Sequence, residues 1–475
     1  MSEKQRETAS KEFPQWKEWF IGTGTLGFTM CNSVMNTFYF FFLTNVVQMS
    51  PAFMAIVTTV SRFAGVFYAP IKGVIMDKAE WKSGKYSVYM KWFEPIGRIL
   101  MCLCFVNVQA SQTVQFIYYV GIFVVAGFFL TFPDTAAMGS IRLVAKTPDA
   151  AVRMSSKKSV VATAGQVIYS LVTVSLVALL GKGDQGKGYL WVYILYSAIA
   201  IIGYQLTAAI VTKDYDLYKV DNAKKEDKAV EEKVKIPFST YIKSYTHSFA
   251  PISLLIGDAC KASASLLYAG AITYYLTYYV QQPEKLTPFL MTANISMLVG
   301  SYCCPFVAKL VGKKWTNVIS YGGFGLFLIL GYFVGVGTAL GITVCVGAGR
   351  FCSGLNASII GAYYIDMAED YENKCGVNMM AFYMSVGGLS WTLASVFCGT
   401  IVGTTLAKVG FSATAPVTQP MLDAMLRLNT LIPGIPLAIG TVIFALGYNL
   451  TDKHMEKVHA ELQAKKAAAA EAKAE

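Results

Sequence analysis

The sequence predicts an all-α membrane protein with twelve transmembrane helices in two six-helix bundles. Three observations carry this prediction: the composition, the length of the apolar runs and the position of the longest polar break. Of the 475 residues, 55% are hydrophobic and 15% are charged, whereas an ordinary soluble domain has about 25% charged residues. We therefore expect most of the chain to lie within a lipid bilayer.

The apolar residues fall in continuous runs that are long enough to cross a membrane, for which a helix needs about 20 residues. Because the runs are continuous and do not alternate with polar residues, they favour helices over a β-barrel. The predicted spans cover residues 19–47, 52–76, 92–108, 113–140, 159–181, 188–212, 249–280, 287–311, 316–337, 339–366, 379–406 and 428–450.

The longest internal polar stretch, residues 213–235, divides the predicted spans six and six. Similar loop sequences, GVIMDKAEWKSGKY (73–86) and KLVGKKW (309–315), follow the second and eighth spans and indicate an internal duplication. Two parallel repeats with a substrate path between them are the usual plan of a major-facilitator-type transporter. The predicted organisation is an N-terminal bundle (1–212), a cytoplasmic linker (213–240), a C-terminal bundle (241–451) and a cytoplasmic tail (452–475).

Basic residues concentrate in alternate loops, as in residues 142–158 and 219–235, while the intervening loops, such as 107–113, are short and nearly uncharged. The positive-inside rule then places both termini in the cytoplasm. We interpret the net charge of +11 as anchoring against anionic lipid headgroups rather than as nucleic-acid binding. The expected location is a plasma or inner cell membrane, with the protein acting as a monomer.

No catalytic or metal-binding constellation is visible in the sequence. The ten cysteines lie almost entirely within apolar runs and show no metal-site or disulfide spacing. Of the three histidines, His247, His454 and His459, two fall in the tail, which we interpret as a solvated helix without a chemical role. GTGTLG (22–27) matches a dinucleotide-binding pattern, but it enters an apolar helix and follows no strand. We therefore expect no enzyme activity, no cofactor and no metal site.

Three loops carry a resemblance to a known family: GVIMDKAEWKSGKY (73–86), TPDAAVR (147–153) and IDMAEDYENKCG (365–376). In these loops the chain resembles the glycoside–pentoside–hexuronide:cation symporters, the melibiose-permease-like branch of the major facilitators. The resemblance implies alternating-access uptake of a sugar, glycoside or uronide, coupled to a proton or a sodium ion. The third loop is the most specific of the three, and its matching positions are Asp366, Glu369, Glu372, Lys374 and Gly376.

The chain departs from the family pattern at the cation site on the second helix. Family members place carboxylates there, one turn apart. When the chain is matched at Arg62 and Pro70, these positions become Gly65 and Ala69. The departure makes a proton a better expectation than sodium for the coupling ion.

The sugar-binding positions are kept in part. The acidic position of the first helix corresponds to Thr29, and the lysine expected on the eleventh helix corresponds to Thr392. Asp134 keeps the family pattern, with Thr131 one turn before it, and Lys158 stands where a basic sugar-binding residue begins the fifth helix.

Charged side chains inside a bilayer cost about 2.5–3.5 kcal/mol each on insertion scales, so each one needs a function or a partner. Glu94 and Arg98 are four residues apart, and Asp258 and Lys261 are three apart, so each pair faces one side of its helix and is expected to pair locally. For the first pair a structural role is favoured. For the second pair a structural role and a role in substrate binding or coupling stay open.

Arg62, Asp134 and Arg350 have no such partner nearby in the sequence. Asp134 is interpreted as an acceptor for sugar hydroxyls or as the titrating group, and a structural bridge to Arg62 is the alternative. Arg350 and Lys261 favour an anionic substrate, because guanidinium holds a carboxylate by two parallel hydrogen bonds. A uronide, an acidic glycoside or another organic anion fits these two cations.

The predicted site residues form three sets. Substrate binding is assigned to Thr29, Asp134, Lys158, Lys261, Arg350, Trp391 and Thr392, where Trp391 would stack on the sugar, and cation coupling to Thr131, Asp134 and Asp258. Gating is assigned to Asp77, Arg142, Arg153, Asp366, Glu369, Glu372 and Lys374. Asp366 is expected to bond Arg142 or Arg153 when the cytoplasmic side is shut, and most other charges of its loop are expected to face water. The alternatives are an uncoupled facilitator of an organic anion and a non-transporting receptor or scaffold on the same fold.

Overall fold

The structure is a computed structural model of the chain. It describes residues 13–78, 81, 84–145, 148–211, 243–335, 338–377, 379, 382–383 and 388–474, so the predicted linker, 213–240, lies outside the described residues. Every regular element in these ranges is a helix, and no strand occurs among them. The predicted all-α class is confirmed.

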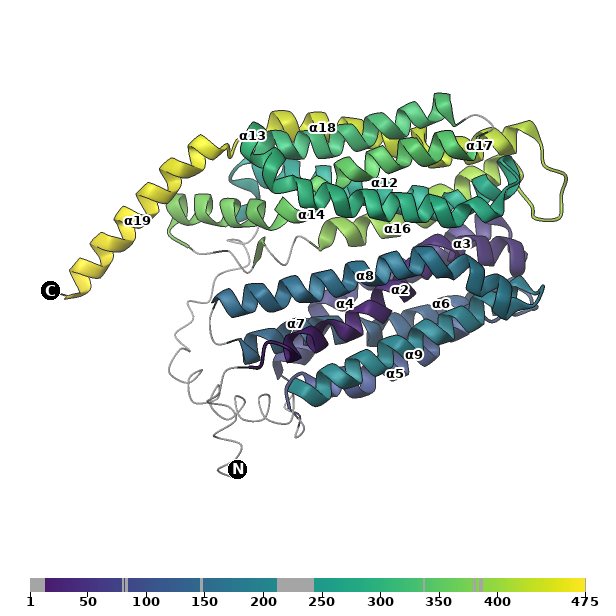
Figure 1. The fold of residues 1–475 in the computed structure, drawn as a ribbon, viewed down its shortest axis with the longest axis horizontal. Coiled ribbons are helices and arrows are strands. Elements are labelled where there is room, and N and C mark those ends of the chain that lie inside the picture. Colours follow the sequence, from purple (N-terminus) through teal and green to yellow (C-terminus); the bar gives the residue numbers. More distant parts are fainter. Residues whose placement is uncertain are drawn as a thin grey trace. The chain divides into compact units, whose positions relative to one another are not determined.

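The chain divides into two compact units. Unit 1 comprises Met1–Val234 and Gly410–Ala415, and unit 2 comprises Lys235–Val409 and Pro416–Glu475. Within each unit, long helices run side by side along a common direction (Figure 1). Eight stretches of the described residues are long and apolar enough to cross a membrane. This number is consistent with twelve spans. Two predicted spans merge in the stretch Pro283–Val334, spans 19–47 and 92–108 are divided into shorter helices, and span 339–366 lies in the unbroken helix Ala339–Cys375, which is not among the eight.

Unit 1 interrupts several of its predicted spans. The fourth span is broken at Pro133, which occupies the first turn of a new helix, because proline has no N–H to continue the preceding helix. The helices of unit 1 are η1 (Lys17–Gly22), α2 (Thr23–Thr37), α3 (Tyr39–Phe41), η2 (Phe42–Val46), α4 (Pro51–Lys78), η3 (Tyr89–Phe93), α5 (Glu94–Cys102), η4 (Leu103–Phe105), α6 (Gln112–Leu130), α7 (Pro133–Val144), α8 (Pro148–Gly181) and α9 (Gln185–Val211).

Unit 2 joins its second and third predicted spans into one long element, α13 (Leu286–Val334), with a break at Gly312, where φ is 81° and ψ is 161°. Only glycine adopts this backbone conformation at little cost, and a Cβ there would also meet Asp452. The other helices are α12 (Phe249–Tyr274), η6 (Tyr275–Tyr279), η7 (Pro283–Lys285), α14 (Ala339–Cys375), α16 (Leu389–Lys408), α17 (Gln419–Asn429), α18 (Leu431–Gly447) and α19 (Asp452–Ala474).

Small residues let the helices of each unit approach closely. In unit 2, a Cβ on Gly300 of α13 would meet the backbone of Phe351, and one on Gly354 of α14 would meet the backbone of Met297. Such contacts are typical of membrane helices, whose association depends on close packing rather than on exclusion of water. The close approach of α13 and α14 also brings their polar side chains within hydrogen-bonding distance.

Candidate functional site

In unit 1 the polar centre is Asp134, which the Pro133 break places in the first turn of α7. Lys158 of α8 donates a hydrogen bond from Nζ to Asp134 Oδ1 at 2.7 Å. Tyr204 of α9 and Thr25 of α2 donate to the same oxygen at 3.3 Å and 3.4 Å. Four helices therefore meet at one carboxylate, and two residues of the predicted substrate set form an ion pair.

The alternative bridge from Asp134 to Arg62 is wrong. Arg62 Nη2 instead donates to Asn36 Oδ1 at 3.4 Å, and its guanidinium lies over the Phe40 ring at 5.3 Å. Lys158, about three turns into α8, takes the place beside Asp134. Among the described residues, Asp134 thus has its countercharge within its own unit.

A second lysine near Asp134 was missed in the sequence. Lys72 of α4 donates from Nζ to Thr135 Oγ1 at 2.9 Å, and the Thr135 hydroxyl in turn donates to the backbone carbonyl of Thr131. Its presence inside the predicted span 52–76 was the signal that could have identified it. Two lysines therefore flank the single carboxylate of Asp134.

Thr29 does not reach this centre in the described structure. Its hydroxyl donates to the backbone carbonyl of Thr25 at 2.7 Å, so the hydrogen is used within α2. The threonine that contacts Asp134 is Thr25, one turn earlier. Sequence matching to the family found the right helix and missed the residue that makes the contact.

The expected local pairing of Glu94 with Arg98 is present in the structure. Arg98 Nε donates to Glu94 Oε1 at 2.7 Å, the guanidinium lies over the Phe28 ring at 5.4 Å, and both residues are fully buried. Glu94 Oε2 and both Arg98 Nη atoms have no hydrogen-bond partner among the described residues. The pair lies deep inside unit 1 and is incompletely satisfied.

In unit 2 the polar centre is built around Asn356 of α14. Lys261 Nζ donates to Asn356 Oδ1, and Asn356 Nδ2 lies 3.5 Å from Asp258 Oδ1 and 2.8 Å from Asn317 Oδ1. The direct pairing expected for Asp258 and Lys261 is therefore replaced by a bridge through the asparagine amide. The signal was an asparagine inside an apolar span, and no pattern in the sequence could have identified its partners.

Two tyrosines complete the surroundings of Asp258. Tyr321 of α13 donates its hydroxyl to Asp258 Oδ1, and Tyr364 of α14 donates to Oδ2 at 3.4 Å. Asp258, on α12, is thus held by groups from two other helices, α13 and α14. None of these partners was predicted, because they come from distant parts of the sequence.

Arg350 of α14 is buried next to this network. Its Nη1 donates to Ser265 Oγ at 3.3 Å, its Nη2 contacts the Met297 sulfur, and its guanidinium lies over the Tyr268 ring at 5.6 Å. Its Nε has no hydrogen-bond partner, and no ion pair joins it to a carboxylate among the described residues. Lys261 and Arg350 therefore place two cations in this part of unit 2 against the single carboxylate of Asp258.

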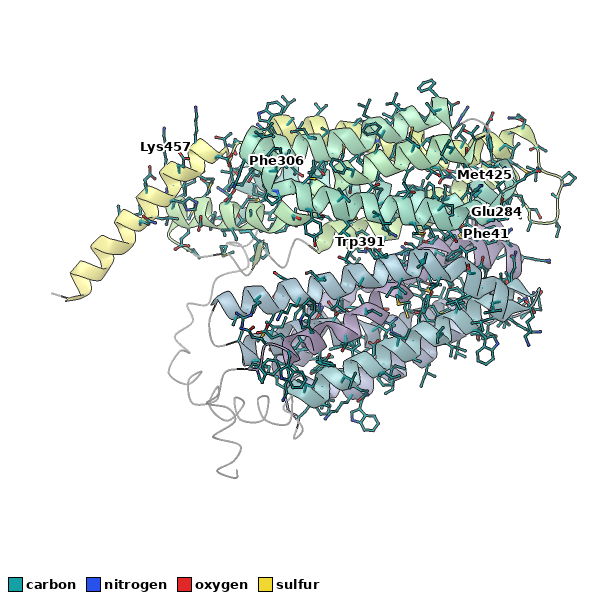
Figure 2. The ribbon with its side chains drawn as sticks, viewed as in Figure 1. Phe41, Glu284, Phe306, Trp391, Met425 and Lys457 are labelled. Carbon is teal, nitrogen blue, oxygen red and sulfur yellow. The ribbon has the colours of Figure 1, made fainter. Side chains whose placement is uncertain are left out.

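On α16, Trp391 is exposed and Thr392 is partly buried. The Trp391 side chain is 50% exposed, and Figure 2 shows it on the surface of unit 2. Thr392 donates its hydroxyl to the Gly388 carbonyl at 3.2 Å. Neither residue is part of the buried network around Asn356.

Two residues of the predicted gating set have a countercharge inside their own unit. Asp366 is buried and accepts hydrogen bonds from Lys313 Nζ at 2.6 Å and 2.9 Å, while Arg153 pairs with the buried Glu18 at 2.8 Å. The bond of Asp366 to Arg142 or Arg153 with the cytoplasmic side shut stays a prediction. The side chains of Asp77 and Arg142 lie outside the described part of the structure.

The acidic stretch 366–374 forms the last turns of α14 rather than a loop, and the expectation that most of its charges face water is wrong for Asp370, which is fully buried. His454 Nε2 lies 3.0 Å from Asp370 Oδ1, His247 Nε2 lies 3.3 Å from Oδ2, and Lys374 Nζ lies 2.6 Å from Oδ2. His459 Nδ1 lies 3.0 Å from Glu369 Oε2. All three histidines of the chain therefore gather at the end of α14.

The basic groups around Asp370 strongly favour its ionised form. Burial alone would raise the pKa of Asp370, but the hydrogen bonds from His247, His454 and Lys374 outweigh it and hold that pKa well below its usual range. No group of three or more histidine, cysteine or acidic side chains is arranged to hold a metal in the part of the chain that the structure describes. The cluster ties the tail helix to α14, so the tail does have a role that the sequence did not reveal.

Solved structures with the same fold are transporters. The nucleoside transporter NupG aligns with a TM-score of 0.59 at 14% identity, covering 92% of this chain and 100% of that chain. A peptide transporter POT aligns with a TM-score of 0.64 at 12% identity, covering 95% of this chain and 99% of that chain. These alignments show that the chain shares the fold of these transporters.

The family model described as MFS/sugar transport protein matches residues 20–452. The chain belongs to this family, which confirms the resemblance found in its loops. The isoprimeverose transporter of Lactiplantibacillus pentosus is 24% identical over 471 residues, covering 96% of this chain and 93% of that protein. An Escherichia coli protein provisionally named the glycoside/cation symporter YagG is 22% identical over 473 residues, covering 95% of this chain and 96% of that protein.

Proposed function

We propose that the protein imports an acidic sugar, such as a uronide or an acidic glycoside, by alternating access and together with a proton. The single observation that carries the anionic substrate is Arg350, a buried guanidinium whose Nε has no hydrogen-bond partner among the described residues. A carboxylate would complete its hydrogen bonds and supply its missing countercharge. The names of the relatives, an isoprimeverose transporter and a glycoside/cation symporter, support a glycoside as the rest of the substrate.

The charge balance of unit 1 supports the same substrate class. Lys72 and Lys158 flank Asp134, so this centre also carries more cationic than anionic groups. The Asp134 carboxylate can in addition accept sugar hydroxyls, as Tyr204 and Thr25 already donate to it. We propose Asp134 and Lys158 as the substrate-binding residues of unit 1, and Lys261 and Arg350 as those of unit 2.

Proton coupling is proposed to use Asp134 or Asp258. The positions that carry cation-binding carboxylates in the resembling family are Gly65 and Ala69 in this chain, and neither residue offers a side-chain oxygen for sodium. A carboxylate exchanges a proton when its surroundings alternate between wet and dry. Thr131, which lies at the end of α6 next to Asp134, stays a member of the proposed coupling group.

The remaining assignments are proposals as well. We place the protein in a plasma or inner cell membrane with both termini in the cytoplasm, from the distribution of basic residues. Asp366, Glu369, Glu372 and Lys374 stay proposed gating residues. The ion pair of Asp366 with Lys313 and that of Asp370 with Lys374 support gating through contacts within unit 2.

Uptake by purified protein in liposomes tests the proposal. With an inward proton gradient, a labelled uronide is expected to accumulate above its external concentration, and a sodium gradient alone should not drive it. Arg350→Gln should raise the KM for the uronide at least about tenfold while changing that of the matching neutral glycoside much less, because only the acid group uses the guanidinium. Arg427→Gln, which changes an arginine in the last turn of α17, is the matched control.

Three outcomes separate the rival functions. Equilibration without accumulation would identify an uncoupled facilitator. Acid-driven uptake that survives Asp134→Asn and Asp258→Asn together would contradict coupling through these carboxylates. Absence of both uptake and ligand-induced thermal stabilisation across a panel of neutral and acidic glycosides would favour a receptor or scaffold.

A further inference from the structure

Asn356 lies between two charged side chains of unit 2, Asp258 and Lys261, and its amide group contacts both. It is 2% exposed, and its amide lies where α12, α13 and α14 meet. Its Oδ1 accepts the hydrogen bond from Lys261, while its Nδ2 faces Asp258 and two further acceptors on α13. The Oδ1 end of the amide therefore interacts with the Lys261 ammonium, and the Nδ2 end interacts with the Asp258 carboxylate.

The Nδ2 end of Asn356 has more acceptors than hydrogens. An amide NH₂ carries two hydrogens, and three oxygens lie within reach: Asn317 Oδ1 at 2.8 Å, Tyr321 Oη at 3.4 Å and Asp258 Oδ1 at 3.5 Å. Which two acceptors are used depends on how strongly each one attracts a hydrogen. A carboxylate attracts it more strongly than a neutral oxygen does, so the charge on Asp258 influences the orientation of the amide.

We propose that Asn356 is a positioning residue that makes the availability of the Lys261 ammonium depend on whether Asp258 carries a proton. This inference rests on the proposed proton-coupled uptake of an acidic substrate. When Asp258 is ionised, its charge attracts the Nδ2 end, and the Oδ1 end holds Lys261. When a proton from water forms an O–H bond at Asp258, that attraction falls and Lys261 becomes free to bind the substrate carboxylate beside Arg350.

The release of substrate follows by the reverse step. Loss of the proton from Asp258 to water restores the negative charge, the amide reorients, and Lys261 is drawn back to Oδ1. The acidic substrate then loses one of its two cations. Proton and substrate are thereby bound and released together, as symport requires, with no direct contact between them.

Other charged or titratable groups face Asp258 from each helix packed against it. Lys261 lies on α12, Tyr321 on α13 and Tyr364 on α14, and Arg350 acts on Lys261 through its charge. The charge on Asp258 also reaches Tyr245 and Tyr363. Tyrosines ordinarily titrate near pH 10, above the range used for transport assays, so the carboxylate is the group in this network whose proton would drive the change.

The first test measures the KM for a labelled uronide between pH 5.5 and 8 in liposomes. For the unchanged protein the KM is expected to rise at least about tenfold with pH, and for Asn356→Leu it should vary less than about twofold while some transport remains. Asn429→Leu is the matched control. Asn429 is also a buried asparagine of unit 2, but its amide donates to a backbone carbonyl of its own helix at 2.8 Å. The inference is overturned if Asn356→Leu keeps the full pH dependence.

A second measurement needs no substrate and separates this inference from the proposed function. Thermal midpoints are measured for Asp258→Asn, Lys261→Met and the double variant, in the presence of Asn356 and again with Asn356→Leu. We expect the shifts in thermal midpoint caused by Asp258→Asn and Lys261→Met to be non-additive when Asn356 is present and additive in the Asn356→Leu background. Equal non-additivity in both backgrounds would show that Asp258 and Lys261 interact without the amide, and would overturn the inference. If the thermal midpoints behave as expected but no uronide is transported, only the proposed function is refuted.

Discussion

At the scale of single residues, the molecule keeps its buried charges by surrounding each one with specific partners. Glu94 and Arg98 are the extreme case, because both are fully buried and their only mutual hydrogen bond uses Arg98 Nε and Glu94 Oε1. Desolvating two charges costs several kcal/mol, and their attraction recovers this only when the remaining donors and acceptors are also satisfied. The unsatisfied atoms of this pair indicate that it contributes little net stability.

Single and double substitutions of this pair are expected to differ sharply. Glu94→Leu or Arg98→Met alone should lower the unfolding free energy by about 3–5 kcal/mol, because each leaves one buried charge without a partner. The double variant should recover most of that loss, since no buried charge then remains. Thermal unfolding in detergent measures all three.

The matched control is the exposed pair of Asp184 and Lys187, in which Asp184→Asn should change the midpoint little. Additive losses in the double variant would mean that the pair does not interact as the structure shows. If the stable double variant also lost uptake, the pair would belong to the substrate site rather than to the framework.

At the scale of elements, the sequence and the structure agree where a local rule decides the outcome. Pro133 begins α7 and Gly312 breaks α13, and both follow from the backbone chemistry of one residue. The packing of α19 against α14 depends instead on contacts between residues that are distant in the sequence. Its apolar residues Met455, Val458 and Leu462 are buried, and its histidines meet acidic residues of α14 that lie 84 and 90 positions earlier.

Figure 1 shows α19 extending beyond the other helices of unit 2, with the end of α14 beside its first turns. Asp370→Asn should weaken this attachment, because the charge-assisted hydrogen bonds from His247, His454 and Lys374 each contribute about 1.5–3 kcal/mol. Hydrogen exchange in α19 is expected to accelerate at least about tenfold at pH 7. Glu456→Gln, which removes a charge from an exposed position of the same helix, should leave the exchange unchanged.

The pH dependence of the attachment follows from the lowered pKa of Asp370. A carboxylate with a lowered pKa in the folded state contributes its full stabilisation above the ordinary aspartate value of about 4. That contribution is lost as the pH falls from there towards the folded-state value. The protection factors of α19, in which the intrinsic pH dependence of exchange is divided out, should therefore fall below about pH 4. A fall in protection between pH 7 and pH 5 would contradict this assignment to Asp370.

At the scale of the whole molecule, chemical labelling of cysteine residues can test the six-plus-six organisation and the orientation in the membrane. Cys375, just after the acidic stretch of α14, is the one exposed cysteine of the ten, and the others are buried or partly buried. With both termini in the cytoplasm, a membrane-impermeant maleimide should label Cys375 in inside-out vesicles and not in right-side-out vesicles.

Cys375→Ser supplies the control, since labelling of inside-out vesicles should disappear with it. Labelling of Cys375 from the outside would reverse the predicted orientation of all spans. The same assay on single cysteines placed in the loops after the second and eighth spans would test whether the two bundles share one orientation, as an internal duplication requires.

The sequence alone determined the all-α membrane class of the protein and identified several of its buried charges, such as Glu94, Arg98 and Arg350. These properties depend on composition, run length and single-residue chemistry, all of which are local. The tertiary structure decided the partners: Lys158 for Asp134, Asn356 between Asp258 and Lys261, Lys313 for Asp366 and the histidines around Asp370. Partners of this kind come from helices that are distant in sequence, and only the packing of those helices, with their breaks and small-residue contacts, sets the distances that choose one polar group over another.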